Sequence, residues 1–450
     1  MFDTLILSRI QFATNMTFHI LFPTISIALG WVLFYFKVKF NKTGDTIWSD
    51  AYQFWVKIFA LTFALGVVSG ITMSFQFGTN WPGYMQTVGN IAGPLLGYEV
   101  LSAFFLEATF LGIMLFGSKR VSQRAHTFAT FLVAFGTSLS AFWIIALDSW
   151  MQTPQGFEMI NGQAHATNWI EIVFNPSMPY RFFHMMTASF LTVTFLIAGI
   201  SSYRYLKGIN LTGSRVLIKL AMTVAVVLAP LQIVIGDLHG LNTLEYQPVK
   251  VAAMEGIWET TKGAPAVLFA LPNESLKANQ YEIAIPKLAS LYLTHSWDGE
   301  VKGLDAFPDT KPPVKPVFFA FRIMVGIGIL MLITAGVGFY LTRKSKELPK
   351  WFLKTLNVMT FSGWLGVIAG WYVTEIGRQP YLVTGVLKTA DAVTKVPANM
   401  VLGTLIMYLI LYLGLITSYI WVVFYLARQT STDQFVGIEK TGLINSIAGA

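Results

Sequence analysis

Long apolar stretches separated by short polar connections make up most of the chain. A bilayer core about 30 Å thick needs ~20 consecutive apolar residues when the chain crosses it as a helix. Nine stretches of roughly this length carry few charges, and they lie at residues 12–36, 53–75, 95–117, 126–150, 180–203, 216–236, 317–341, 354–374 and 400–427. The pattern predicts an all-α integral membrane protein, built as a bundle of nine transmembrane helices.

The amino-acid composition agrees with a membrane protein and narrows its chemistry. Only 12% of the residues are charged and 54% are hydrophobic, whereas soluble domains carry about 25% charged residues. Soluble enzyme folds are therefore excluded. The chain has no cysteine, which excludes disulfides, iron–sulfur clusters, thiolate zinc sites and covalent c-type haem attachment. Any redox cofactor must be held by histidine, methionine or carboxylate side chains.

The distribution of positive charge predicts the orientation of the bundle. Lysine and arginine near helix ends stay on the cytoplasmic side, and every second connection between the predicted spans is rich in them. These residues are Lys37, Lys39, Lys42, Lys119, Arg120, Arg124, Arg204, Lys207, Arg215, Lys219, Arg343, Lys344, Lys346, Lys350 and Lys354. The connections at residues 76–94 and 151–180 contain neither residue type. The amino terminus is therefore predicted outside and the carboxy terminus in the cytoplasm, and the net charge of +8 reflects topology rather than nucleic-acid binding.

One long hydrophilic stretch interrupts the pattern at residues 237–315. It follows a helix that runs outward, so we expect it outside the membrane. Long loops between packed elements are usually functional or disordered, and apolar segments such as 264–271 indicate some packing on the membrane surface. The chain is therefore expected to have three parts: helices 1 to 6 in residues 1–236, an external functional loop in 237–315, and helices 7 to 9 in 316–450.

Three side chains inside the predicted spans are candidate metal ligands. His19, His184 and Met324 lie at similar depths, counted from the outer end of each span. An imidazole and a thioether on two helices can approach opposite faces of a haem iron, which is our interpretation of His184 and Met324. The alternative is that His184 forms a hydrogen bond within the bundle and that Met324 fills a gap in the core. His19 is a candidate ligand because histidine is rare inside membranes.

Two carboxyl groups lie on the third predicted helix. Glu99 and Glu107 are separated by eight positions in the sequence, which places them on broadly the same face of a helix. Intramembrane carboxyl groups can hold and pass protons. The pair is therefore a candidate proton relay, and the alternative is two protonated, hydrogen-bonded structural acids.

Charged side chains also lie near the outer ends of the seventh and eighth spans. Glu375 can ligate iron or pair with Arg378, which follows it closely in the sequence. Arg322 lies inside the seventh span near Met324. Because an unpaired guanidinium is costly there, we expect a haem propionate or an acidic side chain to neutralise it.

Several short motifs around these residues point to a known family. They are residues 7–12 (LSRIQF) before His19, 75–81 (FQFGTNW), Glu99, 104–107 (FFLE), 150–152 (WMQ), 319–324 (FAFRIM) and 377–380 (GRQP). With them, the chain resembles subunit I of the cytochrome bd-type quinol oxidases over nearly its whole length. A bundle of nine helices with an external loop between helices 6 and 7 is also what this family implies.

The resemblance implies three haems. His184 and Met324 would ligate a low-spin haem b, with Arg322 beside it. His19 and Glu375 would each hold iron in a high-spin pair, made of haem b and either haem d or a further haem b, where O2 is reduced. The resemblance leaves open which of these two ligands holds the oxygen-reactive haem. It also implies cofactor contacts for Arg9 and for Trp371, the latter between haems.

The resemblance further implies roles in quinol oxidation and proton transfer. In the external loop, Lys250 and Glu255 would hydrogen-bond the quinol and accept its protons. Glu99 and Glu107 would lie on the route of protons toward the haems, and Arg378 would belong to the catalytic site. The loop resembles that of the short-loop branch, which includes the cyanide-insensitive oxidases, and Tyr381 stands where tryptophan is usual. Haem d and haem b at the third site therefore both remain open.

The expected activity is that of a terminal quinol oxidase in the bacterial cytoplasmic (inner) membrane. Quinol would be oxidised at the outer face and O2 reduced to water with cytoplasmic protons, which generates a proton gradient without a pump. The resemblance implies a second multi-helix subunit as partner and allows a small single-helix subunit, with no role for nucleic acid.

Two other functions are compatible with parts of the pattern. A proton-coupled transporter would use Glu99, Glu107 and Arg322 for substrate and protons, but it predicts discontinuous helices around a site at the midplane. A haem-containing membrane anchor would pass electrons onward without touching O2. It would need only His184 and Met324.

Overall fold

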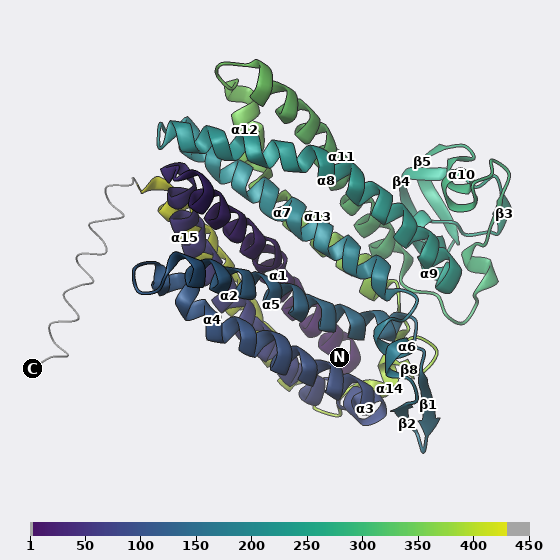
Figure 1. Ribbon diagram of the computed structural model, residues 1–450. Helices are drawn as coiled ribbons and strands as arrows, with labels where there is room; N and C mark the ends of the chain where they lie inside the picture. Colours follow the sequence, from purple (N-terminus) through teal and green to yellow (C-terminus); the bar gives the residue numbers. More distant parts are fainter. Residues whose placement is uncertain (1–2, 430–450) are drawn as a thin grey trace, which may run out of the picture.

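The computed structural model describes residues 3–429, and within them nine helical segments are long and apolar enough to cross a membrane. They run side by side (Figure 1). Their bounds are Thr4–Thr43 (α1), Thr46–Thr79 (α2), Pro82–Lys119 (α3, η1, α4 and η2), Gln123–Gln152 (α5), Trp169–Leu206 (α6 and α7), Leu211–Tyr246 (α8), Val314–Lys344 (α11), Lys350–Ile376 (α12, η4 and α13) and Ala398–Arg428 (α15). The predicted fold class is confirmed.

Local sequence explains where these helices begin and end. Gly44 ends α1 with a left-handed backbone at φ 67°, which glycine adopts without a Cβ clash. Asp45 follows at once and caps α2 by accepting a hydrogen bond from the Ile47 amide at 3.0 Å. Ser122 caps α5 in the same way through the Ala125 amide. The connections at this end of the bundle are therefore short, and adjacent helices run antiparallel.

Two connections between helices are shorter in the structure than the sequence pattern predicts, because the flanking helices are longer. The connection expected at residues 76–94 is mostly helical, because α2 runs to Thr79 and α3 begins at Pro82. The stretch expected to leave the bundle at residue 237 remains helical to Tyr246, the end of α8. Hydropathy detects only the apolar part of a helix, whereas the helices continue beyond it with polar residues.

Helices α1 and α7 are the most buried spans, and α15 is the least buried. The largest cluster of buried apolar side chains contains residues from several helices, including Phe22, Trp55, Phe195, Phe352 and Tyr419. Glycines allow two helices to approach closely: a Cβ on Gly363 of α13 would lie 2.6 Å from Cα of Thr192 on α7. Small residues at such contacts are typical of membrane bundles.

The segment between α8 and α11 folds onto the end of the bundle. It contains α9 (Pro248–Glu255), β3 (Thr261–Lys262), β4 (Ala266–Asn273), β5 (Ala278–Ile285), α10 (Leu288–Thr294), β6 (Glu300–Val301) and η3 (Leu304–Ala306). Strands β4 and β5 form an antiparallel hairpin, and β3 pairs with β6. Val267 and Ala270 of β4 pack against Phe318 of α11. The apolar segment 264–271 therefore packs on the bundle and on the core of the loop itself.

Smaller elements cover the same end of the bundle. An antiparallel hairpin joins α5 to α6 (Trp169–Val173), and its strands are β1 (Phe157–Ile160) and β2 (Gln163–Ala166). Strands β7 (Tyr381–Val383) and β8 (Leu387–Lys388) and helix α14 (Thr389–Ala392) follow α13. Residues 430–450, the last part of the expected third segment, lie outside the described residues.

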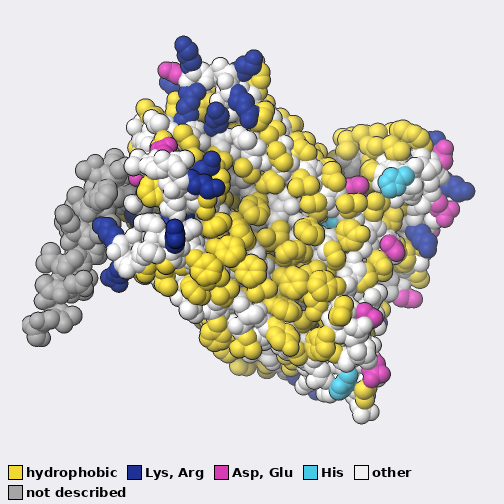
Figure 2. Space-filling view, viewed as in Figure 1, with side chains coloured by type: hydrophobic (Ala, Val, Ile, Leu, Met, Phe, Trp, Pro, Cys, Tyr) yellow, Lys and Arg dark blue, Asp and Glu magenta, His cyan; other side chains and the backbone are white. Residues whose placement is uncertain are grey.

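Charged side chains are unevenly distributed between the two ends of the bundle. Lysine and arginine gather around the connections opposite the loop, whereas most acidic side chains in this view lie at the loop end (Figure 2). Between the ends the visible surface is mostly hydrophobic. A wide apolar band of this kind is what a lipid or a partner helix would cover.

Candidate functional site

Trp371 of α13 lies where the helices carrying the candidate ligands meet. Its side chain packs against a buried cluster that contains Ile20 of α1 and Met185 of α7. These two residues directly follow His19 and His184 in the sequence. Gly370, which precedes Trp371, faces Met324 of α11. The structure thus brings the surroundings of three candidate ligands to one region of the bundle.

His19 is oriented by a hydrogen bond to the neighbouring helix. Its Nδ1 lies 2.9 Å from Oγ of Ser69 on α2, and Gly70 leaves room for the ring: a Cβ there would lie 3.2 Å from His19 Cε1. A ligating imidazole usually uses one nitrogen for the metal and the other for such a hydrogen bond. Nε2 of His19 is therefore the nitrogen suited to hold iron.

His184 lies against α8 next to a second histidine that the sequence analysis did not select. The ring centroids of His184 and His239 are 5.3 Å apart with an angle of 69° between their planes. Gly236 of α8 lies against the same ring, because a Cβ there would be in van der Waals contact with His184 Cε1 at 3.4 Å. Nδ1 of His184 is buried without a hydrogen-bond partner among the described residues. The hydrogen bond expected under the alternative interpretation of His184 is thus not made by Nδ1.

Met324 presents its sulfur to α13. A Cβ on Gly370 would lie 3.0 Å from Met324 Sδ, so glycine at this position leaves space for the thioether. Any larger residue at position 370 would displace it. Helix α11 packs on α8 and α13, and both of these helices also pack on α7, which carries His184.

A network of buried charges lies at the loop end of α13. Arg378 pairs with Glu375 and also lies 3.5 Å from Oδ1 of Asp148. Arg181 lies 3.5 Å from the other oxygen of Asp148. Gln152 donates a hydrogen bond to Glu375 at 3.2 Å. Of the two possibilities for Glu375, the structure contains the ion pair with Arg378.

This network contains more hydrogen-bond donors than acceptors. Nε of Arg181 and both Nε and Nη1 of Arg378 are buried without a hydrogen-bond acceptor among the described residues. Buried guanidinium groups normally have every N–H paired. Carboxylates are the preferred bidentate partners of arginine, so the unpaired N–H groups fit the propionate groups of a haem.

Lys250 of α9 points into the same network. Its Nζ donates to Gln152 Oε1 at 2.7 Å, to Gln247 Oε1 at 2.9 Å and to the Thr374 carbonyl at 3.1 Å. Burial, reinforced by the positive charges of nearby arginines, holds the pKa of Lys250 well below its usual value. Lys250 therefore connects the loop to the region of Glu375.

Glu255, at the other end of α9, points to a different set of partners. Its carboxylate lies 3.9 Å from Nη2 of Arg322 and forms a hydrogen bond with the Tyr292 hydroxyl. Burial raises the pKa of Glu255, and the charge of Arg322 opposes that shift. Arg322 also donates to the carbonyls of Met254 and Val267. The group that neutralises Arg322 in the structure is thus an acidic side chain.

Glu99 and Glu107 both face α5. Ser140 donates a hydrogen bond of 2.6 Å to Glu99, and Gly136, one turn away on α5, lies against Glu107. Oε1 of Glu107 is buried without a hydrogen-bond partner among the described residues. A π-helix, residues Glu99–Phe104, begins at Glu99, and such segments are often found at functional sites. The common face expected from the spacing is present.

Arg9 lies farther from these groups, at the loop end of α1. It is ten positions before His19 (19 − 9 = 10), which corresponds to ~15 Å along a helix. Its side chain lines an open cleft of about 500 Å³ together with residues of the loop and of the segment after α13. The structure therefore places Arg9 among surface cations.

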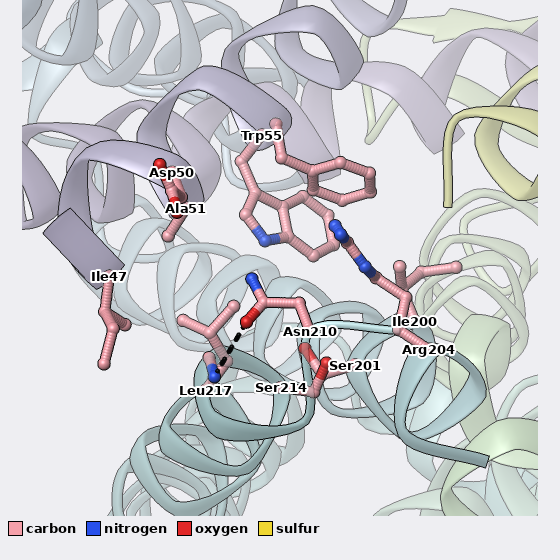
Figure 3. Close-up of a pocket in the computed structure, with 12 residues that line it drawn as sticks. Ile47, Asp50, Ala51, Trp55, Ile200, Ser201, Arg204, Asn210, Ser214 and Leu217 are labelled. Carbon is pink, nitrogen blue, oxygen red and sulfur yellow. Dashed lines mark hydrogen bonds between the residues drawn. The ribbon is translucent and has the colours of Figure 1, made fainter. Parts of the chain in front are cut away.

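A second cavity lies near the other end of the bundle, between α2, α7 and α8. Trp55, Arg204 and Asn210 converge on it (Figure 3), and Nε of Arg204 and Nε1 of Trp55 are buried without partners among the described residues. Its volume of about 20 Å³ is close to the minimum that one water molecule requires. It is too small for a cofactor.

Four polar residues of this region were not predicted from the sequence: Asp148, Arg181, His239 and Tyr292. Asp148 and Arg181 lie at the ends of predicted spans, where charges are ordinary. His239 lies in the stretch that was expected to be a loop. In the structure α8 continues through it, so His239 lies three positions after Gly236, the residue that faces His184. Tyr292 carries no signal in the sequence, because only the folded loop brings it to Glu255.

Comparisons with known proteins agree with one another. Residues 7–431 match the family model described as cytochrome bd terminal oxidase subunit I. The chain is 36% identical over 423 residues to cytochrome bd ubiquinol oxidase subunit 1 of Bacillus subtilis (strain 168), covering 91% of this chain and 90% of that relative. It is 33% identical over 501 residues to cytochrome bd-II ubiquinol oxidase subunit 1 of Escherichia coli (strain K12), covering 95% and 96%. The structure of bd oxidase from Geobacillus thermodenitrificans superposes with a TM-score of 0.87 at 31% identity, covering 95% of this chain and 99% of that one.

Proposed function

This chain belongs to the cytochrome bd terminal oxidase subunit I family, and from that premise we propose that it is the haem-bearing subunit that oxidises quinol and reduces O2 to water. It is a quinol oxidase of a haem-containing family and a multi-pass protein of the bacterial inner membrane. The observation that best supports the further assignments is the convergence of the candidate ligands around Trp371.

His184 and Met324 are the proposed ligands of a low-spin haem b. The packing of Gly370 against the thioether supports this pair, because a Cβ there would lie only 3.0 Å from the Met324 sulfur. Gly236 lies beside the His184 imidazole. His239, beside His184, would border the same haem. Arg322 is better assigned to Glu255 than to a propionate.

His19 and Glu375 are the proposed ligands of the high-spin pair, made of haem b and either haem d or a further haem b. When bound, these haems supply the electron transfer and the reduction of O2. Trp371, on the same helix face as Glu375 and packed against the helices of His19 and His184, would lie between the cofactors. Arg181 and Arg378 would hold the propionates, because Nε of Arg181 and both Nε and Nη1 of Arg378 have no hydrogen-bond acceptor among the described residues.

Glu255 is the proposed acceptor of a proton from quinol. Its carboxylate is held by Arg322 and Tyr292, so a proton that it accepts can be exchanged with the Tyr292 hydroxyl. Lys250 would act on the same site from α9 by fixing the loop to Gln152 and to the end of α13. Residues 237–315 would therefore form the quinol-binding part of the chain, placed between helices 1 to 6 and helices 7 to 9.

Glu107 and Glu99 are proposed to deliver protons for water formation from the cytoplasmic side. Glu107 lies nearer the lysine-rich end and Glu99 nearer the loop end of the same helical segment. With quinol protons released outside and water protons taken from inside, turnover separates charge without a pump. This direction requires the predicted orientation, with the amino terminus outside.

A second multi-helix subunit is the proposed partner, with a small single-helix subunit as a further possible member. The names of two relatives number those proteins as subunit 1 of an oxidase, which supports a multi-subunit enzyme for this chain. Large apolar side chains remain exposed along α2 and α15, among them Ile71, Phe75, Ile410 and Trp421. These helices offer a surface that a partner helix could bury.

The experiment that tests the proposal is a reduced-minus-oxidised absorption spectrum of the purified complex, combined with extraction and quantification of its haems. Three haems including a chlorin are expected for a bd oxidase. Three haems of b type would place the protein in the haem-b-only variant of the same enzyme. A single haem would contradict the oxidase and favour the electron-passing anchor, and no haem would favour the transporter.

A further inference from the structure

Four cations converge on the cleft at the loop end of the bundle. They are Arg9 of α1, Lys277 of the β4–β5 turn, Lys311 before α11 and Lys388 of β8. They come from four separate segments of the chain, so the fold and not a basic run in the sequence brings them together. None of them forms an ion pair or a side-chain hydrogen bond with a residue between 3 and 429.

Among residues 3–429, one acidic side chain lines the cleft, and it has another partner. Glu274 accepts a hydrogen bond of 3.0 Å from the backbone amide of Val314, at the first turn of α11. The amino-terminal end of this 31-residue helix adds partial positive charge to the cleft. The cleft therefore combines four cations with one carboxylate, which already caps the helix end. The charge of the cleft remains positive, and an anion would relieve the repulsion among the cations.

The surroundings of the cleft are those of a membrane surface. It lies at the ends of the spans, where lipid headgroups are found, and Trp258 and Pro312 give it apolar walls. Ile6 and Ile10 are 53% and 46% exposed on α1. Ile6 and Ile10 lie one helical turn apart, so they share one stripe of α1. Each directly follows a residue that lines the cleft, Leu5 or Arg9. Acyl chains can lie along this stripe while a headgroup occupies the cleft.

We propose that this cleft binds the phosphate group of an anionic phospholipid, with the acyl chains packed along Ile6 and Ile10. The volume of about 500 Å³ is in the range of small-molecule sites and accommodates a headgroup. The lipid would connect α1, the loop and the segment after α13. Such a contact would hold the loop on the bundle independently of quinol or haem.

The test measures lipid binding to the purified, haem-loaded complex by native mass spectrometry. Short-chain phosphatidylglycerol, phosphatidylcholine with the same chains, and inorganic phosphate are titrated separately. A lysine near an anionic lipid contributes about 1 kcal/mol, or about fivefold in affinity. The variant Lys311→Gln/Lys388→Gln should therefore bind phosphatidylglycerol roughly 20-fold more weakly than the wild type, with unchanged haem content as the control for folding.

A matched variant, Lys302→Gln/Lys395→Gln, removes the same charge from exposed positions outside the cleft. It should bind phosphatidylglycerol as the wild type does. Equal loss in both variants would overturn the proposal, because net charge alone would then explain it. Equal binding of phosphatidylcholine and phosphatidylglycerol would overturn it too. If inorganic phosphate binds as tightly as phosphatidylglycerol, the cleft is a site for the free anion, and the proposed lipid site is wrong.

Discussion

At the scale of single residues, the identity of an iron ligand depends on one atom. Met324 offers a sulfur to the space beside Gly370, and leucine has nearly the same volume without the sulfur. We expect Met324→Leu to remove the low-spin haem b or convert it to a high-spin form, and to leave the other haems in place. Low-temperature spectra and electron paramagnetic resonance of the purified complex measure this change.

The matched control is Met331→Leu, a buried methionine on the same helix that faces the core. It removes a sulfur without touching a proposed ligand, and its spectrum should equal that of the wild type. If Met324→Leu also keeps the low-spin signal, Met324 is not a ligand and fills the core instead.

The Glu255 carboxyl should determine how quinol oxidation depends on pH. It can accept a proton only when it is ionised, so activity falls as the pH drops through its pKa. Because burial raises this pKa, the loss should begin above the ordinary glutamic acid value of about 4.3. The Tyr292 hydroxyl lowers the pKa of Glu255, so Tyr292→Phe should raise that pKa further and shift the acidic limb to higher pH.

The measurement is kcat/KM for quinol between acidic and neutral pH, with an artificial reductant as reference. Tyr281→Phe, at a 79% exposed position of the same loop, should leave the profile unchanged. Glu255→Ala should depress quinol oxidation more than oxidation of the artificial reductant. Equal loss with both reductants would indicate misfolding. If the acidic limb of the pH profile does not move in Tyr292→Phe, the hydrogen bond from Tyr292 does not influence the pKa of Glu255.

Among single residues, the rule that polar groups are costly in membranes selected the candidate ligands but not the polar residues around them. His19 and His184 were selected as candidates because histidine is rare inside an apolar span. Asp148 and Arg181 were not selected. Charged residues are ordinary at the ends of membrane spans, so their positions along the chain gave no reason to expect an ion pair between them. Their pairing depends on α5 and α7 ending at the same level, which is a property of the packed bundle.

At the scale of helices and strands, glycines allow α7 and α13 to approach closely. A Cβ on Gly363 would lie 2.6 Å from Cα of Thr192, so Gly363→Ala must push the helices apart. Overpacking of this kind costs about 1–3 kcal/mol. The thermal denaturation midpoint of the purified complex should fall accordingly.

Gly336→Ala on α11 is the control, because a Cβ there has no atom within 4 Å. It should leave the midpoint unchanged or raise it slightly, since alanine favours helix over glycine by about 1 kcal/mol. The same midpoint for both variants would show that α7 and α13 do not pack as closely as the structure indicates.

Hydropathy predicted the number of spanning helices but not their lengths. It reads the apolar part of each helix, so it placed the start of the loop at residue 237, whereas α8 continues to Tyr246. This difference matters for the site, since it carries His239 to His184. The β-hairpin and short helices of the loop depend on contacts such as Val267 with Phe318, which a local pattern does not contain.

At the scale of the whole molecule, the proposed separation of charge during turnover depends on which way the bundle faces. The proposed proton uptake requires the lysine-rich end, visible in Figure 2, in the cytoplasm and the loop outside. The absence of native cysteine makes this testable with one introduced thiol at a time. Lys302→Cys lies at an exposed position of the loop, and Lys346→Cys lies at an exposed position between α11 and α12.

In intact spheroplasts, a membrane-impermeant maleimide should label Lys302→Cys and leave Lys346→Cys unlabelled. Both should react once the membrane is opened with detergent, which controls for accessibility of each thiol. Labelling of Lys346→Cys in intact spheroplasts would place the loop inside. Quinol protons would then be released into the cytoplasm, the proposed direction of charge separation would be reversed, and Glu107 would lie on the outer side of the haems.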